Sequence, residues 1–255
     1  MFKNLYAYRE LLKTSVKKDI RGKYKGSILG FLWAFLNPLL MLTIYSLVFP
    51  HILRVEEANY TMFIFVALIP WTYFTNSVVS GAATILANAN IIKKVYFPRE
   101  ILPISVVTGA TINFLISCVI ILIALAVTGI GFSYYILFFP LILLIQYIIT
   151  LAIVFIVACL TPYFRDLEHI IGVFMIALFY ATPIIYPLSL IPESFRWVLN
   201  LNPLARIIMA YRDILYYQQI PNLGGLFKLG IISVVLCVFG YYIFNKLQKG
   251  FAEEL

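Results

Sequence analysis

A short charged segment, NIIKKVYFPREILP at residues 90–103, interrupts an otherwise apolar chain. Its charged side chains surround an aromatic pair, Tyr96 and Phe97, that precedes Pro98. Aromatic residues ringed by polar groups are typical of a contact with another protein. The segment therefore predicts a docking surface, with a short helix over 84–95 that stops before the proline. The candidate contact residues are Asn90, Lys93, Lys94, Tyr96, Phe97, Pro98, Arg99 and Glu100. A plain connecting loop with lysines on the cytoplasmic side is the alternative.

A second charged loop, YFRDLEHI at residues 163–170, follows another long apolar stretch. We expect Arg165, Asp166 and Glu168 to reach the same partner. The sequence has no glycine-rich phosphate loop ending in Gly-Lys-Ser or Gly-Lys-Thr, so it does not bind ATP by that route. Its three cysteines lie in apolar stretches, and His51 and His169 are far apart. We therefore expect no catalytic residue, cofactor or metal site in this chain.

The composition is that of an integral membrane protein. Of the 255 residues, 63% are hydrophobic and 12% are charged, whereas a soluble domain has about 25% charged residues. Nothing from Ala58 to Ile92, or from Ile101 to Phe164, is charged. Apolar stretches of about 20 residues or more predict membrane-spanning helices. In this class the net charge of +8 indicates anchoring by Lys and Arg at the cytoplasmic face, and not nucleic-acid binding.

We expect an all-α fold with six membrane spans. The uncharged stretch over 101–164 is too long for one crossing, and it turns at TGIGFS, residues 128–133. With both termini in the cytoplasm, 14 of the 19 Lys and Arg residues lie on the cytoplasmic side, in agreement with the positive-inside rule. The predicted spans are 29–49, 60–81, 101–127, 134–160, 170–186 and 229–245.

Two further segments complete the expected architecture, a single membrane domain over 1–255 whose spans occupy 29–245. Residues 1–25 carry eight Lys and Arg among apolar residues at steps of three and four, which predicts an amphipathic cytoplasmic interface helix. Residues 187–225 hold two short helical patterns that split at Asn202-Pro203. Each pattern is too short to span, so we expect outer re-entrant or interfacial helices between spans five and six.

The acidic residues argue against two kinds of membrane protein. Every Asp and Glu lies outside the predicted spans, whereas proton-coupled transporters place ionisable groups near the midplane. Enzymes that act on lipid phosphates need clustered carboxylates or histidines, and here these residues are scattered. A membrane domain driven by a separate ATPase is the favoured interpretation. A membrane enzyme of lipid-linked glycan assembly and a structural anchor without transport are the alternatives from other classes.

Five segments resemble, in the same order, the type-2 ABC exporter permeases that move polysaccharides of the O-antigen or teichoic acid type. They are RGKYKGSILGFLWAFLNPLL (21–40), IIKKVYFPREILP (91–103), YFRDLEHI (163–170), TPIIYP (182–187) and LNPLARIIMAYRDIL (201–215). The resemblance covers nearly the whole chain. It implies a homodimer in the bacterial plasma (inner) membrane, with two copies of a separate ATPase subunit that binds ATP and Mg. An ABC permease for a drug or a small lipid shares this topology and is the alternative within transport.

The resemblance also implies where the parts of the transporter lie. Residues 1–20 match the family's interface helix, and residues 84–98 match its coupling helix between spans two and three. The loop with Arg165, Asp166 and Glu168 matches the short cytoplasmic loop before span five. Residues 192–215 match its outer re-entrant helices, and the pore forms between the two permeases.

The implied cargo is a polysaccharide on an undecaprenyl diphosphate carrier in the membrane lipid. We expect Arg21, Lys23 and Lys25 to receive the anionic diphosphate, although plain anchoring to the leaflet explains them equally well. The glycan would then slide along aromatic rings, which pack on the apolar faces of sugars. The candidate path residues are Phe31, Trp33, Phe35, Trp71, Tyr73 and Tyr180. For each of them, packing against lipid or a place in the interfacial belt is the alternative.

Overall fold

The computed structural model describes residues 6–24, 26–53 and 59–255, and these residues form helices, turns and loops without a strand. The all-α prediction is therefore confirmed for this part of the chain. In chain order the helices are α2 (Arg9–Tyr24), η1 (Gly30–Leu32), α3 (Trp33–Leu53), α4 (Tyr60–Ala87), α5 (Ala89–Lys94), α6 (Ile101–Val127), η2 (Tyr134–Phe138), α7 (Phe139–Leu160), α8 (Leu167–Tyr180), η3 (Leu188–Leu190), η4 (Glu193–Phe195), α9 (Arg196–Leu201), α10 (Pro203–Leu215), α11 (Leu223–Leu247), η5 (Gln248–Gly250) and α12 (Phe251–Glu254), where η marks a 3-10 helix.

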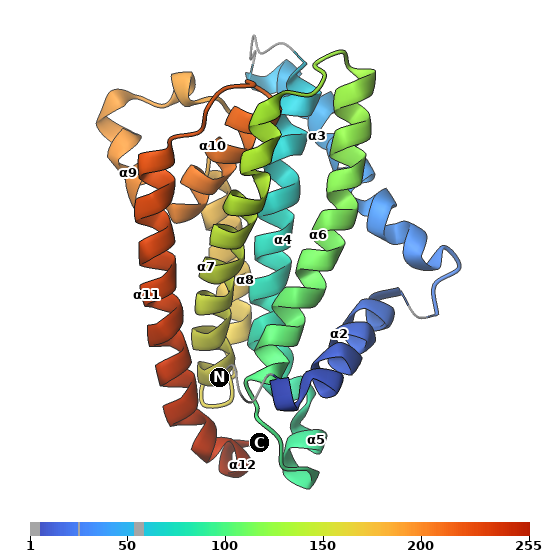
Figure 1. The fold of residues 1–255 in the computed structure, drawn as a ribbon, viewed down its shortest axis with the longest axis vertical. Helices are drawn as coiled ribbons and strands as arrows, with labels where there is room; N and C mark the ends of the chain where they lie inside the picture. The colour runs from blue at the N-terminus through green and yellow to red at the C-terminus, as the bar shows by residue number, and fades with distance from the viewer. Residues whose placement is uncertain (1–5, 25, 54–58) are drawn as a thin grey trace.

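Long apolar helices run along the long axis of the molecule, with α4 among α6, α7 and α8 (Figure 1). Among the described residues, four segments are long and apolar enough to cross a membrane: Tyr60–Lys94, Ile101–Val127, Tyr134–Leu160 and Leu223–Gly250. Two apolar helical stretches are shorter, Phe35–Tyr45 and Leu167–Tyr180. The chain is thus a multi-pass membrane protein.

The helix bounds agree with the predicted spans at some ends and differ at others. The helix predicted over 101–127 is α6 itself, and η2 with α7 covers 134–160. Helix α4 continues six residues past the predicted end at Gly81. Helix α8 stops at Tyr180 instead of Tyr186, because a proline at 183 disfavours the helical conformation of the residue before it.

The short helix predicted over 84–95 is smaller than expected. Residues 84–87 belong to α4, and α5 begins only at Ala89. Asn88 separates the two helices, because its side chain Nδ2 donates to Thr84 O (2.8 Å) and its backbone N–H bonds back to Ile85 O. Such local side-chain bonds compete with helix propagation.

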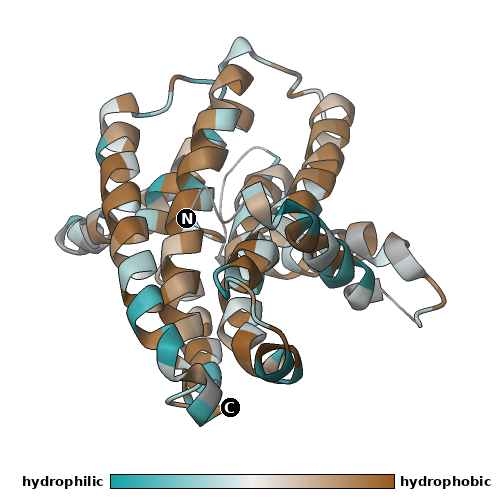
Figure 2. Ribbon diagram, turned by 60° about the horizontal axis from the view of Figure 1, so that its bottom comes forward, coloured by the Kyte–Doolittle hydropathy of each residue, from teal (hydrophilic) through white to brown (hydrophobic). Residues whose placement is uncertain are grey.

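Hydrophilic residues gather on α2 and at the end of the bundle that carries α5 and α12, whereas the long helices are mostly hydrophobic (Figure 2). Helix α2 packs on α6 near Gly109, where an added Cβ would meet Asp19 Cβ at 3.8 Å. Ser105 Oγ donates to Asp19 Oδ2 (3.2 Å), and Lys18 Nζ donates to Asn88 Oδ1 (3.0 Å). The N-terminal helix is therefore tied to both ends of the α4–α6 connection.

The predicted split at Asn202-Pro203 is present, and it separates α9 from α10. Asn202 Oδ1 caps α10 by accepting from Leu204 N (3.0 Å) and Ala205 N (3.3 Å). Its Nδ2 donates to Thr182 Oγ1 (2.9 Å), which fastens the cap to the turn after α8. Both helices lie at the end of the molecule opposite α5 (Figure 1).

Helices α7 and α11 approach closely at Gly240, where an added Cβ would lie 2.7 Å from Ala152 O. We expect Gly240→Ala to force the helices apart and to cost about 1–3 kcal/mol. Gly230→Ala on the same helix is the matched control, because its Cβ would make only ordinary contacts, with Ile145 Cγ1 at 3.7 Å and Cδ1 at 3.8 Å. Thermal unfolding of the purified protein in detergent, followed by fluorescence-detected size exclusion, measures both changes. Equal melting temperatures for the two variants would show that the close approach of α7 and α11 at Gly240 does not determine stability.

Candidate functional site

The end of the bundle at α5 joins the two predicted loops through the C-terminal segment. Arg99 Nη1 donates to Gln248 O, and its guanidinium lies 5.7 Å from the ring centroid of Phe251. From the other loop, Tyr163 OH donates to Leu247 O (2.8 Å), and its ring lies 6.3 Å from that of Phe251. The two loops are therefore held together by residues 247–251, which sequence reasoning did not include.

The candidate contact residues in the first loop divide into exposed and buried groups. Tyr96 is 94% exposed, whereas its neighbour Phe97 is 7% exposed and packs in the core of the chain. Glu100 is also buried, and Pro98 and Arg99 are half-buried. The exposed members of the predicted set are Asn90, Lys93, Lys94 and Tyr96. Among the candidate residues of this loop, these four are therefore the most accessible to a partner.

The second loop presents Arg165 and Asp166 as exposed side chains, and Glu168 is half-buried in the first turn of α8. Exposed apolar side chains accompany the charged ones in both loops: Ile91, Val95 and Phe164. The two loops together thus expose aromatic, aliphatic and basic groups, of which the aromatic groups are the kind enriched at protein interfaces. We call the exposed residues 90–96 together with 164–166 the α5-end surface.

The predicted lipid-diphosphate residues lie on or beyond the end of α2. Arg21 is exposed on the last turn of the helix. The side chain of Lys23 and all of Lys25 lie outside the described residues. Beyond this point Trp33 Nε1 donates to Ser27 Oγ (2.9 Å), which links the connecting segment to the start of α3.

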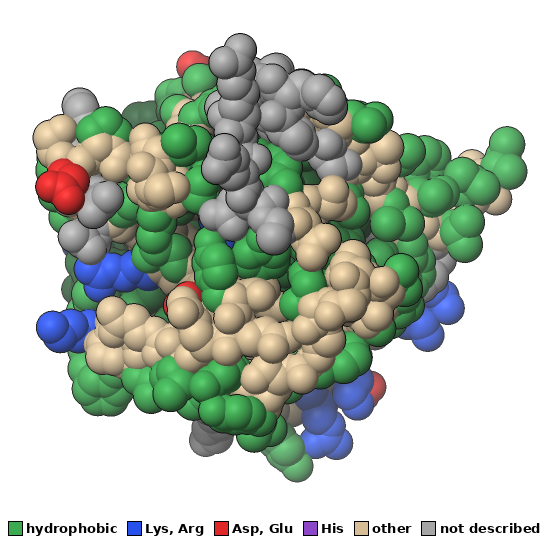
Figure 3. All heavy atoms as spheres, turned by 90° about the horizontal axis from the view of Figure 1, so that it is seen from above, with side chains coloured by type: hydrophobic (Ala, Val, Ile, Leu, Met, Phe, Trp, Pro, Cys, Tyr) green, Lys and Arg blue, Asp and Glu red, His purple; other side chains and the backbone are tan. Residues whose placement is uncertain are grey.

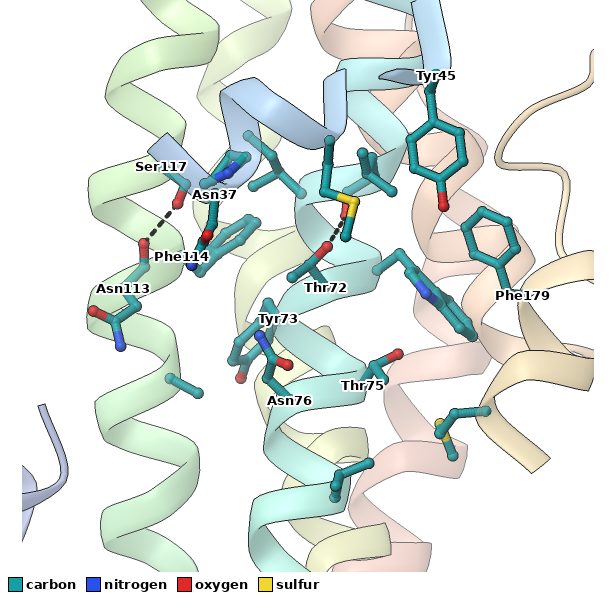
Figure 4. A pocket seen from close by; sticks show the side chains of 18 of the residues that line it. Asn37, Tyr45, Thr72, Tyr73, Thr75, Asn76, Asn113, Phe114, Ser117 and Phe179 are labelled. Atoms are coloured by element: carbon teal, nitrogen blue, oxygen red, sulfur yellow. Dashed lines mark hydrogen bonds between the residues drawn. The ribbon is translucent and has the colours of Figure 1, made fainter. Parts of the chain in front are cut away.

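A groove of about 970 Å³ lies among α3, α4, α6 and α8 (Figure 4). Many of the lining side chains lie at steps of three or four residues along these helices. From α4 come Thr72, Thr75, Asn76 and Val79; from α6, Ala110, Asn113, Phe114 and Ser117; from α3, Asn37, Met41 and Tyr45; and from α8, Met175, Phe179 and Tyr180. None of the described lining residues is charged.

The groove combines aromatic rings with amide and hydroxyl groups. Trp71 and Phe179 meet edge to face at 5.7 Å, and Tyr45 lies 6.0 Å from Phe179. Asn and Thr side chains offer both donors and acceptors without a fixed charge. Figure 4 shows Asn76 and Asn113 projecting from α4 and α6 into this space. The groove is therefore suited to a neutral, hydroxyl-rich ligand.

Four of the six predicted path residues line this groove: Trp33, Trp71, Tyr73 and Tyr180. Trp71 and Tyr73 are buried in the wall, whereas Tyr180 is exposed. Phe35 is half-buried and is not among the lining residues, and the side chain of Phe31 lies outside the described ones. Sequence reasoning missed the amides and hydroxyls, although their helical spacing at 72 and 76, and at 113 and 117, is a readable signal.

Arg212 on α10 is a second feature that sequence reasoning missed. The side chain is 3% exposed, and its Nε donates to Phe63 O (3.2 Å). Its Nη1 and Nη2 donate to Pro183 O and Ile184 O, both at 2.5 Å. The guanidinium also lies 3.5 Å from the ring centroid of Phe63. One side chain therefore joins α10 to α4 and to the turn after α8.

The chain is similar in sequence to known transporter subunits. The family model described as "ABC-2 type transporter" matches residues 10–216. An O-antigen export system permease protein RfbA from Myxococcus xanthus is 38% identical over 257 residues, covering 100% of this chain and 99% of the relative. The protein of the same name from Klebsiella pneumoniae is 38% identical over 253 residues, with 99% and 97% covered. The polysialic acid transport protein KpsM of Escherichia coli is 22% identical over 91% of both chains. A protein with this match along most of its length belongs to the ABC-2 type transporter family.

Proposed function

We propose that this chain is the permease subunit of an ATP-driven exporter that moves a polysaccharide across the bacterial plasma membrane. The observation that carries the proposal is the 38% identity, along the whole chain, to permeases named for O-antigen export. The uncharged groove supports it, because amides, hydroxyls and aromatic rings suit a neutral glycan.

The energy would come from a separate ATPase subunit that binds ATP and Mg. We place its contact at the α5-end surface, where Tyr96 protrudes beside exposed Lys93 and Lys94. Burial of such an aromatic anchor in a pocket of the partner would transmit movement to α4 and α6, which flank the loop. The functional unit is a homodimer with two ATPase subunits, and the groove of each permease forms half of the path.

The proposed topology has six spans with both termini in the cytoplasm, and α3 and α8 complete the four longer spans. A helix of 14 residues such as α8 is about 21 Å long, so it crosses only together with the turn that follows it. Helices α9 and α10 are then outer re-entrant helices. We expect a cysteine at Tyr96, in a variant that lacks Cys118, Cys159 and Cys237, to resist an impermeant maleimide in intact cells. Labelling of this cysteine from outside would show that residue 96 lies on the outer side and that the proposed orientation is wrong.

The cargo would be a glycan on an undecaprenyl diphosphate carrier, and Arg21 with Lys23 and Lys25 would attract the diphosphate to the inner leaflet. A long polymer must slide, so many weak contacts along the groove suit it better than one tight site. The polar groups of the groove can form hydrogen bonds with the hydroxyl groups of the passing glycan, in place of those that water formed.

Asn76 tests this path, because it is exposed on the groove face of α4. We expect Asn76→Asp to reduce export several-fold, because it places a charge in a low-dielectric groove and removes two donors. Asn76→Ser keeps the site neutral and should retain most of the export. Surface glycan, measured by lectin binding alongside the amount of assembled complex, separates transport from folding. Normal export by the Asp variant would indicate that the glycan does not pass through this groove.

A further inference from the structure

A second cavity, of about 730 Å³, lies at the opposite end of the molecule from α5, between α10, the start of α11 and the 187–189 loop. Helical spacing brings its side chains onto facing surfaces. Arg206 and Asp213 lie two turns apart on α10, and Gly224 and Lys228 lie one turn apart on α11. None of these residues belongs to the groove or to the α5-end surface.

The cavity has an excess of positive charge. Its lining contains Arg206, Arg212 and Lys228 but a single carboxylate, Asp213. Among the described residues, no ion pair joins Arg206 or Lys228 to an acidic group. Basic side chains gather at the left of the outer face in Figure 3, with an acidic one beside them. Arg212 is occupied by its three carbonyl acceptors, whereas Lys228 is exposed and Arg206 is half-buried, so these two cations can reach an anion from outside.

Asp213 offsets only part of this charge, and its carboxylate has a polar partner of its own. Its Oδ1 accepts from Gln219 Nε2 (2.6 Å), and Gln219 N donates to Asp213 O (2.8 Å). Burial raises the pKa of the Asp213 carboxyl, and the bond from Gln219 opposes that shift. The carboxylate is therefore hydrogen-bonded within its own turn of chain, and among the described residues no ion pair joins it to Arg206 or Lys228.

The start of α11 adds to the attraction for anions. Asn222 Oδ1 caps this helix by accepting from Gly225 N (2.8 Å). A Cβ at Gly225 would come within 3.2 Å of the Asn222 side chain, so glycine gives the cap its room. The aligned peptide dipoles of a helix favour negative charge at this end.

Part of the cavity wall is apolar, and a surface suited to lipid tails adjoins it. Phe63, Pro187, Leu188 and Leu226 line it. The adjoining face of α11 exposes Leu223, Phe227 and Ile231. A ligand with an anionic head and an apolar tail matches both features.

We propose that this outer cavity binds the phosphate of a membrane lipid headgroup in the outer leaflet, with Arg206 and Lys228 as the phosphate-binding side chains. The leaflet assignment rests on the topology in the proposed function. Two lipids present this chemistry there, an anionic phospholipid and the diphosphate carrier that emerges after export.

Thermal stabilisation of the purified full-length permease in detergent tests the proposal, with dioleoylphosphatidylglycerol, undecaprenyl diphosphate or dioleoylphosphatidylcholine as added lipid. We expect saturable stabilisation by both anionic lipids and none by the zwitterionic one. The Arg206→Gln/Lys228→Gln double variant should need about 30-fold more anionic lipid, because each basic residue near a membrane surface contributes roughly fivefold in attraction. Tighter binding of undecaprenyl diphosphate would identify the emerging carrier, and equal binding would identify a phospholipid.

The matched control is Lys246→Gln/Lys249→Gln, which removes two exposed cations at the other end of the same segment. It should leave lipid stabilisation unchanged. An equal loss in the control, or full retention in the Arg206/Lys228 variant, would overturn the site. This assay needs neither ATPase nor glycan, so its failure leaves the export function standing.

Discussion

Replacing Arg212 by Ala is expected to destabilise the protein by about 3 kcal/mol or more. The change leaves three carbonyl groups, of Phe63, Pro183 and Ile184, without the donors that now reach them. An unsatisfied buried polar group costs about 1–3 kcal/mol. The melting temperature in detergent should fall by roughly 6–12 °C, at about 2–4 °C for each kcal/mol in a chain of this size. The outer helices α9 and α10 should become accessible to protease first, since Arg212 fastens them to α4.

Arg206→Ala is the control, because it removes a half-buried arginine six residues earlier on the same helix. Its melting temperature should stay near that of the parent protein. The melting temperature of Arg212→Lys should lie between those of Arg212→Ala and Arg206→Ala, since an ammonium group cannot match the planar guanidinium that reaches three acceptors. If Arg212→Ala has the same melting temperature as the parent protein, the buried arginine does not hold these helices in place.

Tyr96→Ala and Phe97→Ala should affect different properties, although the residues are adjacent: the first should affect ATPase binding and the second should affect stability. Tyr96 projects from the surface, so its loss should weaken binding of the ATPase subunit without altering the melting temperature. An anchor of this kind contributes about 2 kcal/mol or more, or roughly 30-fold in affinity. Phe97 packs in the core, and its loss should cost about 3–5 kcal/mol of stability.

Co-purification of the tagged permease with its ATPase, together with a melting curve for the permease alone, separates these two effects. Lys93→Ala serves as a control, because an exposed charge contributes less than about 1 kcal/mol. Normal binding and normal coupled ATP hydrolysis in the Tyr96 variant would show that this segment is a connecting loop and not the ATPase contact.

The long helices could be predicted from the sequence because their signal is local. Uncharged stretches located α6 and α7 within a few residues, and Asn202-Pro203 marked the division between α9 and α10. The division at Asn88 was missed, because it depends on how one side chain bonds to its own backbone.

The orientation of single side chains could not be predicted in the same way. Tyr96 and Phe97 lie in a segment without helical or strand periodicity, so nothing in the order of residues shows which one turns inward. Arg212 is one of the five Lys and Arg residues that the predicted topology leaves on the outer side, and its charge gave no sign that the side chain is buried. The turn that contains Pro183 leaves carbonyl groups outside a helix, and only the folded arrangement shows that Arg212 reaches them.

The groove illustrates the same limit. The chain has 42 aromatic residues, so residue type alone could not show which ones line the path, and two of the six predicted residues are not in the described lining. The amides of α4 and α6 identify the face more sharply, because each helix carries a single asparagine, Asn76 or Asn113, and both line the groove. Their convergence depends on how α3, α4, α6 and α8 pack together.

The central claim is polysaccharide export driven by a separate ATPase, and surface glycan measured against the internal pool tests it most directly. A strain that lacks this chain, and a strain whose partner ATPase is inactive, should both lose surface glycan detected by antibody or lectin. Both should accumulate lipid-linked polysaccharide inside the cell, visible on a gel, and the intact chain should restore export only with an active ATPase. Normal surface glycan in both strains, with altered resistance to small toxic compounds instead, would contradict the account and indicate a small-molecule exporter.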